Sequence, residues 1–186
     1  MTILKNLLAI VSLSLLLSAC GDQNAISDPN KVFKIQGVFG VNIGEQGRGL
    51  PEGYIIDNKA FDFTPQSTHP HFISYTYSVT PNTHTIYGIK TKGAREVAKE
   101  NCMLQRQELI KETLRSLGDS PALKVTEEGN KWKIREDNQR EITIDCERSL
   151  TPQKLQLVMV YQDTSLSLLA YKEWNKRQKD ITLFRP

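Results

Sequence analysis

The sequence contains few of the residues from which metal and nucleophilic sites are built, with three histidines and three cysteines in 186 residues. His69 and His71 lie two apart, but His84 follows the turn of a predicted hairpin. About eight strand residues at about 3.4 Å each separate the two positions, which places His84 about 27 Å from His71. The ligands of a zinc ion lie close together instead. The sequence also lacks a nucleophile elbow and a catalytic Cys–His pairing. We therefore predict no metal ion and no cofactor, and we nominate no catalytic residue.

An excess of charge and a second long apolar run are also missing. The net charge is +3 at pH 7 with both signs interspersed, whereas nucleic-acid-binding proteins carry a clustered basic face. After residue 17, no apolar run approaches the roughly 20 residues that a membrane-spanning helix needs. Nucleic acid is therefore not an expected partner, and no small-molecule substrate is evident.

The N-terminus has the order of a secretion signal. Lys5 precedes an apolar run at 7–17, and small residues and a cysteine follow. A basic start, a short apolar core and a small-residue cleavage site are typical of a signal that is removed. We expect residues 1–19 to be this signal peptide.

Leu17-Ser18-Ala19-Cys20 resembles the lipobox of bacterial lipoproteins. The resemblance implies cleavage before Cys20, palmitate and other acyl chains on that residue, and attachment to a membrane facing the periplasm. Gly21 follows the cysteine at the position where an acidic residue marks inner-membrane retention in enterobacterial lipoproteins. The resemblance therefore favours the outer membrane over the inner one. The alternative is an ordinary secreted protein whose cysteine falls at this position by chance.

The remaining chain is long enough for one domain with a real core. Residues 20–31 are the lipidated cysteine and a polar stretch without apolar periodicity, which indicates a flexible tether with a reach of about 18 Å. Residues 32–186 predict a single periplasmic α+β domain. We expect an antiparallel sheet of strand hairpins with two helices packed on one face, in two strand–strand–helix units.

Patterns of period two and period 3.6 place the elements of this domain. We predict a glycine-interrupted strand at 32–44, short strands at 54–56 and 61–63, and one more at 155–161. Hairpins are expected from 72–79 with 85–91 and from 131–135 with 141–147. Helices are predicted at 94–117, ended by Gly118, and at 164–179. Arg106, within the apolar stripe of the first helix, is expected to reach toward solvent.

Cys102 and Cys146 form the best-supported pair in the chain. Cys102 falls on the apolar stripe of the 94–117 helix, and Cys146 shares a strand face with Ile142 and Ile144, since residues two apart point the same way. Both cysteines therefore face the core, and an exported chain meets an oxidising compartment. We predict a disulfide between them, and two free buried thiols are the alternative.

Three residues are candidates for binding a partner. Tyr75 and Tyr77 share one face of the predicted 72–79 strand. If that face is exposed, they form a binding patch, because aromatic residues are enriched at interface centres. The alternative is that they cover the sheet under the helix. Arg48 stands in the loop at 45–53, and loops on a rigid scaffold often carry function.

In size, lipobox and layout, the chain resembles the small uncharacterised lipoproteins of Gram-negative bacteria. Lys34-Ile35-Gln36-Gly37 is similar to the entry strand of the small lipoproteins of the outer-membrane β-barrel assembly machine, whose Gly-Met-Thr helix start is missing here. These resemblances favour a cell-envelope protein that acts by contact with a protein partner, as an accessory or assembly module. The alternatives are an immunity or inhibitor lipoprotein against a periplasmic toxin or lytic enzyme, and a cell-envelope enzyme with no identifiable site.

Overall fold

The computed structural model describes residues 32–50, 60–118, 120–149, 151 and 153–183, and residues 180–183 by their backbone alone. From Phe33 onward the chain forms one compact unit. Its elements, which confirm the predicted α+β class, are β1 Gly37–Val38, β2 Val41–Asn42, β3 Ala60–Asp62, β4 Ser74–Val79, β5 Ile86–Lys92, β6 Val97–Ala98, α1 Lys99–Ser116, β7 Leu123–Glu128, β8 Lys131–Glu136, β9 Arg140–Arg148, β10 Lys154–Asp163 and α2 Thr164–Leu183. Neither helix of this described part combines the length and apolar character that crossing a membrane requires.

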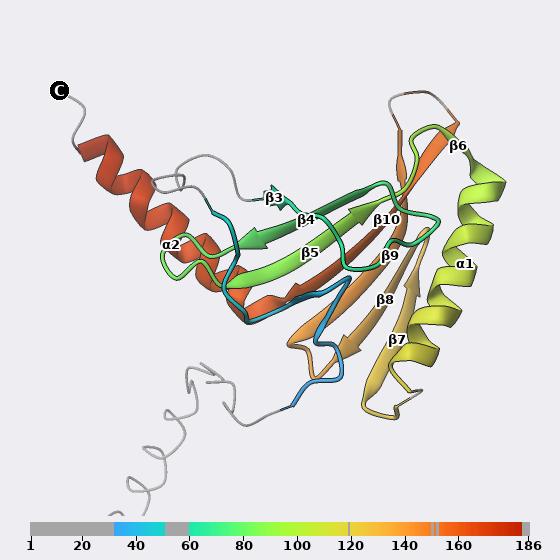
Figure 1. Ribbon diagram of the computed structural model, residues 1–186, viewed down its shortest axis with the longest axis horizontal. Helices are drawn as coiled ribbons and strands as arrows, with labels where there is room; N and C mark the ends of the chain where they lie inside the picture. Colours follow the sequence, from blue (N-terminus) through green and yellow to red (C-terminus); the bar gives the residue numbers. More distant parts are fainter. Residues whose placement is uncertain (1–31, 51–59, 119, 150, 152, 184–186) are drawn as a thin grey trace, which may run out of the picture. The chain divides into compact units, whose positions relative to one another are not determined.

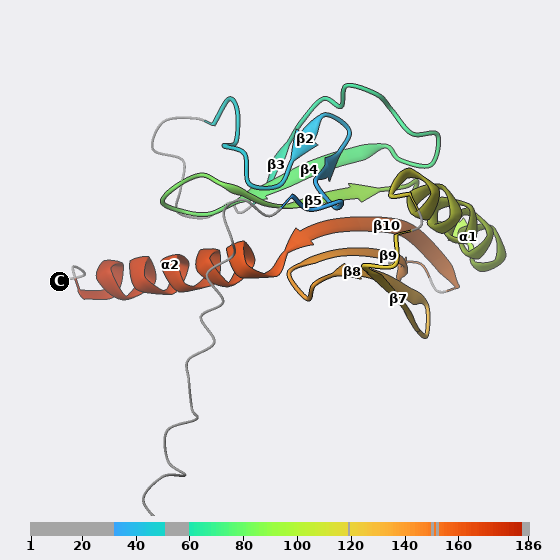
Figure 2. The same ribbon diagram turned by 90° about the horizontal axis from the view of Figure 1, so that it is seen from below.

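The long strands form one antiparallel sheet in the order β3-β4-β5-β10-β9-β8-β7, and β6 pairs with the start of β10 (Figures 1 and 2). Both predicted hairpins are confirmed, as β4–β5 and β8–β9. In the first, Val79 pairs with Ile86, and the Thr80 N–H donates to the Thr85 carbonyl at 2.9 Å to close the turn. The two strand–strand–helix units meet where β5 pairs with β10.

The two helices occupy different places on this sheet. α1 lies across one face, against β9 and β10, whereas α2 continues from the end of β10 and packs against β5 (Figure 2). α1 begins at Lys99 rather than at 94, because Val97 pairs with Leu155 in the β6–β10 ladder and keeps the chain extended there. Gly118 (φ +73°) follows the helix end, as predicted.

Strand β7 was not predicted, because Leu123 and Val125 are its only apolar residues. It pairs with β8 and forms the edge of the sheet beside α1. This placement corrects the prediction for Arg106, which is buried instead of reaching solvent. The Arg106 Nη2 donates to Glu127 Oε1 at 3.2 Å, so the guanidinium joins α1 to the edge strand.

The N-terminal segment differs most from its prediction. The expected strand at 32–44 is wrong, and only the two-residue strands β1 and β2 form there. Phe39 (φ +59°) and Gly40 (φ +84°) make the tight turn between them. The predicted strand at 61–63 appears as β3, and the one at 54–56 lies outside the described residues.

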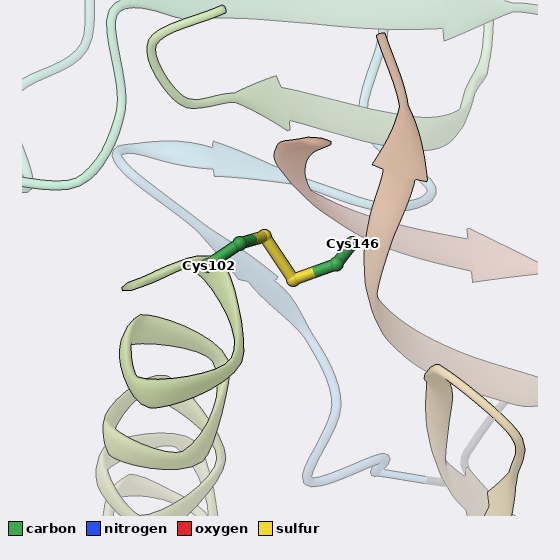
Figure 3. Close-up of a disulfide and its surroundings, with 2 residues drawn as sticks. All are labelled: Cys102 and Cys146. Atoms are coloured by element: carbon green, nitrogen blue, oxygen red, sulfur yellow. A yellow bond between two sulfur atoms is a disulfide. The ribbon is translucent and has the colours of Figure 1, made fainter. Parts of the chain in front are cut away.

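The core lies between one face of the sheet, α1 and the N-terminal segment. Along β9, Ile142, Ile144 and Cys146 are buried while the intervening residues are more exposed, as strand alternation requires. Cys102 of α1 bonds to Cys146 across this core (Figure 3). The predicted disulfide is therefore confirmed. Fully buried residues with large side chains include Ile35, Ile89, Ile134, Ile142, Ile144 and Leu157.

Two buried carboxylates and the part-buried arginine between them fasten the start of the domain to the sheet. Glu136 lies opposite Arg140, and Arg140 lies opposite Asp163, on three neighbouring strands. We call these residues the buried charge row. Glu136 accepts the N–H groups of Lys34 and Ile35, each at 2.9 Å. Arg140 donates to the Ile35 carbonyl at 2.7 Å and to Asp163 at 3.3 Å, so both ends of this backbone stretch are held by ionic hydrogen bonds.

Candidate functional site

Tyr75 and Tyr77 do not form an exposed patch, which corrects that prediction. They are 7% and 5% exposed, and the opposite side of β4 carries serine and threonine. Phe39 packs on Tyr75 with ring centroids 5.1 Å apart, and Phe63 packs on Tyr77 at 5.9 Å. The cover over these tyrosines is therefore the N-terminal segment and the chain around β3, rather than the helix that the alternative prediction invoked.

Tyr77 and Arg48 are nevertheless brought together. The Tyr77 hydroxyl donates to the Arg48 carbonyl at 2.7 Å. Burial raises the pKa of Tyr77, and the hydrogen bond to Arg48 offsets part of this rise. The Tyr77 hydroxyl therefore remains protonated at neutral pH. As a hydrogen-bond donor, it holds the loop in place at the Arg48 carbonyl. Tyr75 takes part elsewhere, donating to the Phe72 carbonyl and accepting the His69 N–H.

The loop that carries Arg48 is held along the start of β5. Gly44 donates to the Ile86 carbonyl at 2.8 Å, and the Ile86 N–H donates to the Glu45 carbonyl at the same distance. Gly47 then passes so close to β4 that an added Cβ would lie 2.9 Å from Val79 Cγ1. A glycine is required at this position because a side chain would push the loop off the strand.

These elements enclose a groove of about 330 Å³, which we call the aromatic groove. Its apolar lining consists of Phe39, Val41, Phe63, Tyr77 and Ile86. Exposed charged side chains stand around it, namely Glu45, Arg48 and Asp62. The arrangement can bury an apolar group from a partner while offering charges of both signs to the groups around it.

Two of the three histidines, His69 and His71, lie side by side, and His84 lies in a different turn. His69 and His71 have ring centroids 5.1 Å apart, and their Nε2 atoms lie 3.0 Å from Glu112 and 3.3 Å from Glu108 on α1. Since each ring faces its own carboxylate, these contacts join the loop before β4 to α1. His84 lies in the β4–β5 turn. Among the residues that the structure describes, no three histidine, cysteine or acidic side chains are grouped as metal ligands.

The buried charge row was not predicted from the sequence. Its signal was present, because Glu136 is two residues from Ile134, and Arg140 is two residues from Ile142. Residues two apart on a strand share a face, so both charges had to lie on the apolar side of the sheet. The pairing with Asp163 depends on the β9–β10 register, which the sequence pattern did not supply.

The chain matches no protein-family model, no curated protein and no solved structure.

Proposed function

We propose that this chain is a lipid-anchored cell-envelope protein that acts by holding a protein partner at the aromatic groove. The lipobox at residues 17–20 supports the anchor, and removal of the signal would leave Cys20 to receive palmitate. The contact rests on one observation, an aromatic lining surrounded by Arg48, Glu45 and Asp62. Aromatic residues and arginine are the types enriched at the centres of protein interfaces.

The size of the groove and the positions of its charges favour a protein segment over a small molecule. Small-molecule sites range from about 300 to 1,000 Å³, and the aromatic groove is near the lower limit at about 330 Å³. Its three charged side chains are exposed, so they do not converge as a buried catalytic or ligand-orienting set. A protruding apolar side chain of a partner fits this lining, and Arg48 suits a nearby carboxylate of the same partner.

Photo-cross-linking in intact cells tests this proposal. A photoreactive amino acid replaces the exposed Gln46, which lines the groove, and in a matched control it replaces the exposed Lys111 on α1. We expect the first position to capture a specific envelope protein that the second does not. Adding Arg48→Glu to the first variant should lower the captured yield at least about tenfold, because a reversed charge at an interface is repulsive.

Two results would contradict the proposal. One is capture of the same proteins from both positions with no effect of Arg48→Glu. The other is no capture from the groove while the purified protein binds a small ligand there. If the captured protein is a toxin or a lytic enzyme whose activity falls on binding, the contact is that of an inhibitor rather than an assembly module.

A further inference from the structure

The outward side of α2 combines apolar and basic side chains. Leu168, Leu169 and Tyr171 are 53%, 39% and 61% exposed. Lys172 and Lys176 are exposed and follow Leu168 at intervals of four residues, so the three side chains form one row along the helix. We call these five residues the outer surface of α2.

The opposite side of α2 is occupied by contacts with the domain. Ala170 is buried, and Arg177 donates to the Asn82 side chain at 2.7 Å and to the Pro81 carbonyl at 3.0 Å. Glu173, which with Asp180 is one of two acidic residues in the α2 sequence, accepts the Asn82 N–H at 2.9 Å. These contacts turn Glu173 toward the β4–β5 turn and away from Lys172 and Lys176. The five residues of the outer surface of α2 are therefore basic or apolar.

The buried charge row places the start of α2 beside the point where the tether enters the domain. Asp163 Oδ1 accepts the Leu166 N–H at 3.0 Å, while its Oδ2 accepts from Arg140, which also holds the Ile35 carbonyl. The chain from Cys20 to Ile35 extends to at most about 50 Å. An anchor on Cys20 therefore keeps the first turns of α2 within this distance of the lipid surface.

We infer that the outer surface of α2 lies on an anionic lipid surface, with Leu168, Leu169 and Tyr171 entering the headgroup region and the two lysines pairing with lipid phosphates. Helices with basic residues beside exposed apolar ones bind such interfaces, with a strength set by apolar area and by attraction to anionic lipid. The location of this contact in the cell rests on the proposed lipid anchor. The contact itself does not, since it can be measured without any acyl chain.

Vesicle binding tests the inference. The chain from residue 21 onward, which contains the whole described core, is exported with a cleavable signal so that its disulfide forms. It is then mixed with vesicles of phosphatidylethanolamine and phosphatidylglycerol, or of phosphatidylcholine alone. We expect at least about tenfold tighter binding to the anionic vesicles, and a loss of this preference as salt screens the lysines.

Two double variants distinguish an effect of the outer surface of α2 on vesicle binding from an effect of net charge. Lys172→Glu/Lys176→Glu should abolish the preference for anionic vesicles. Lys99→Glu/Lys111→Glu, which reverses two exposed lysines of α1, makes the same change in net charge and should bind nearly as the unchanged protein does. Circular dichroism melting is the check that both variants are folded. Equal binding to the two vesicle types, or equal loss in the two double variants, overturns the inference.

The same samples distinguish a second copy of the chain as the occupant. If sedimentation shows a concentration-dependent dimer that Leu168→Asn dissociates, the outer surface of α2 is a self-association surface and the lipid inference is wrong. Failure of the anchor has a different signature, because it abolishes palmitate incorporation in cells and leaves vesicle binding by the unacylated chain unchanged.

Discussion

Arg140 of β9 lies directly opposite Asp163 of β10, and its Nε donates to Asp163 Oδ2 at 3.3 Å. The two side chains are 12% and 3% exposed. Through this pair, one guanidinium joins the start of the folded chain at Ile35 to the strand that leads into α2. A charge at this depth is tolerated because the guanidinium has an ionic partner in Asp163, a carbonyl acceptor in Ile35 and the face of the Phe33 ring 4.3 Å away.

We predict that Arg140→Met lowers the free energy of unfolding by about 3–5 kcal/mol, because it leaves Asp163 buried without its cation and removes the donor to the Ile35 carbonyl. Urea denaturation measures this change. Lys90→Met is the matched control, since its partner Glu147 and the lysine itself are well exposed, and its cost should stay within about 1 kcal/mol. Equal effects of the two substitutions would show that the buried charge row does not hold the N-terminal segment.

Loss of the Cys102–Cys146 bond should also destabilise the domain. The bond closes a loop with a sequence separation of 44 residues, and the chain-entropy relation assigns about 4 kcal/mol to a loop of this size. We expect a lower melting temperature in reducing agent and for Cys102→Ser/Cys146→Ser. The chain from residue 21 onward, denatured without reductant, should take up no alkyl group. Uptake of two alkyl groups would show that the thiols are free.

The lipobox predicts incorporation of palmitate at one residue, Cys20. In a bacterium that processes lipoprotein signals, labelled palmitate should enter the unchanged protein and should not enter Cys20→Ala. The variant should also leave the membrane fraction, because several acyl chains hold the domain there. Equal labelling of the two proteins, or no labelling of either, would remove the basis for placing this chain on a membrane.

Two buried tyrosines predict a loss of stability at alkaline pH. Burial raises the pKa of Tyr161 and, to a lesser extent, that of Tyr77 above the value of about 10 for a free tyrosine. Above about pH 10 the unfolded chain loses these protons while the folded chain keeps them, so the free energy of unfolding falls as pH rises. Below about pH 10 the full contribution is present.

Tyr161→Phe tests whether this buried tyrosine causes the loss of stability at alkaline pH. Urea denaturation across the alkaline range should give a shallower decline for Tyr161→Phe than for the unchanged protein. Tyr171→Phe alters a tyrosine that is 61% exposed and should leave the decline as it was. A decline unaffected by Tyr161→Phe would assign the loss to other groups.

Strand alternation explains why the two hairpins and the disulfide could be predicted from the sequence. Ile142, Ile144 and Cys146 share a face whatever the strand pairs with, and Cys102 belongs to the apolar stripe of its helix. The same rule could not predict that Tyr75 and Tyr77 are buried. It assigned them correctly to one face but did not establish that this face is covered, because the cover comes from residues far away in the chain, such as Phe39 and Phe63.

By itself, the sequence therefore determined the α+β class, the two hairpins and the cysteine pair, and it predicts the lipid anchor from residues 17–20. Each of these depends on neighbours within one element or on a short contiguous motif. The tertiary structure alone decided that Tyr77 holds Arg48 at the aromatic groove, that Arg106 is buried, and that Asp163 is the partner of Arg140. These contacts depend on strand register and on which segment covers a face, and both are set by packing between residues that are distant in the chain.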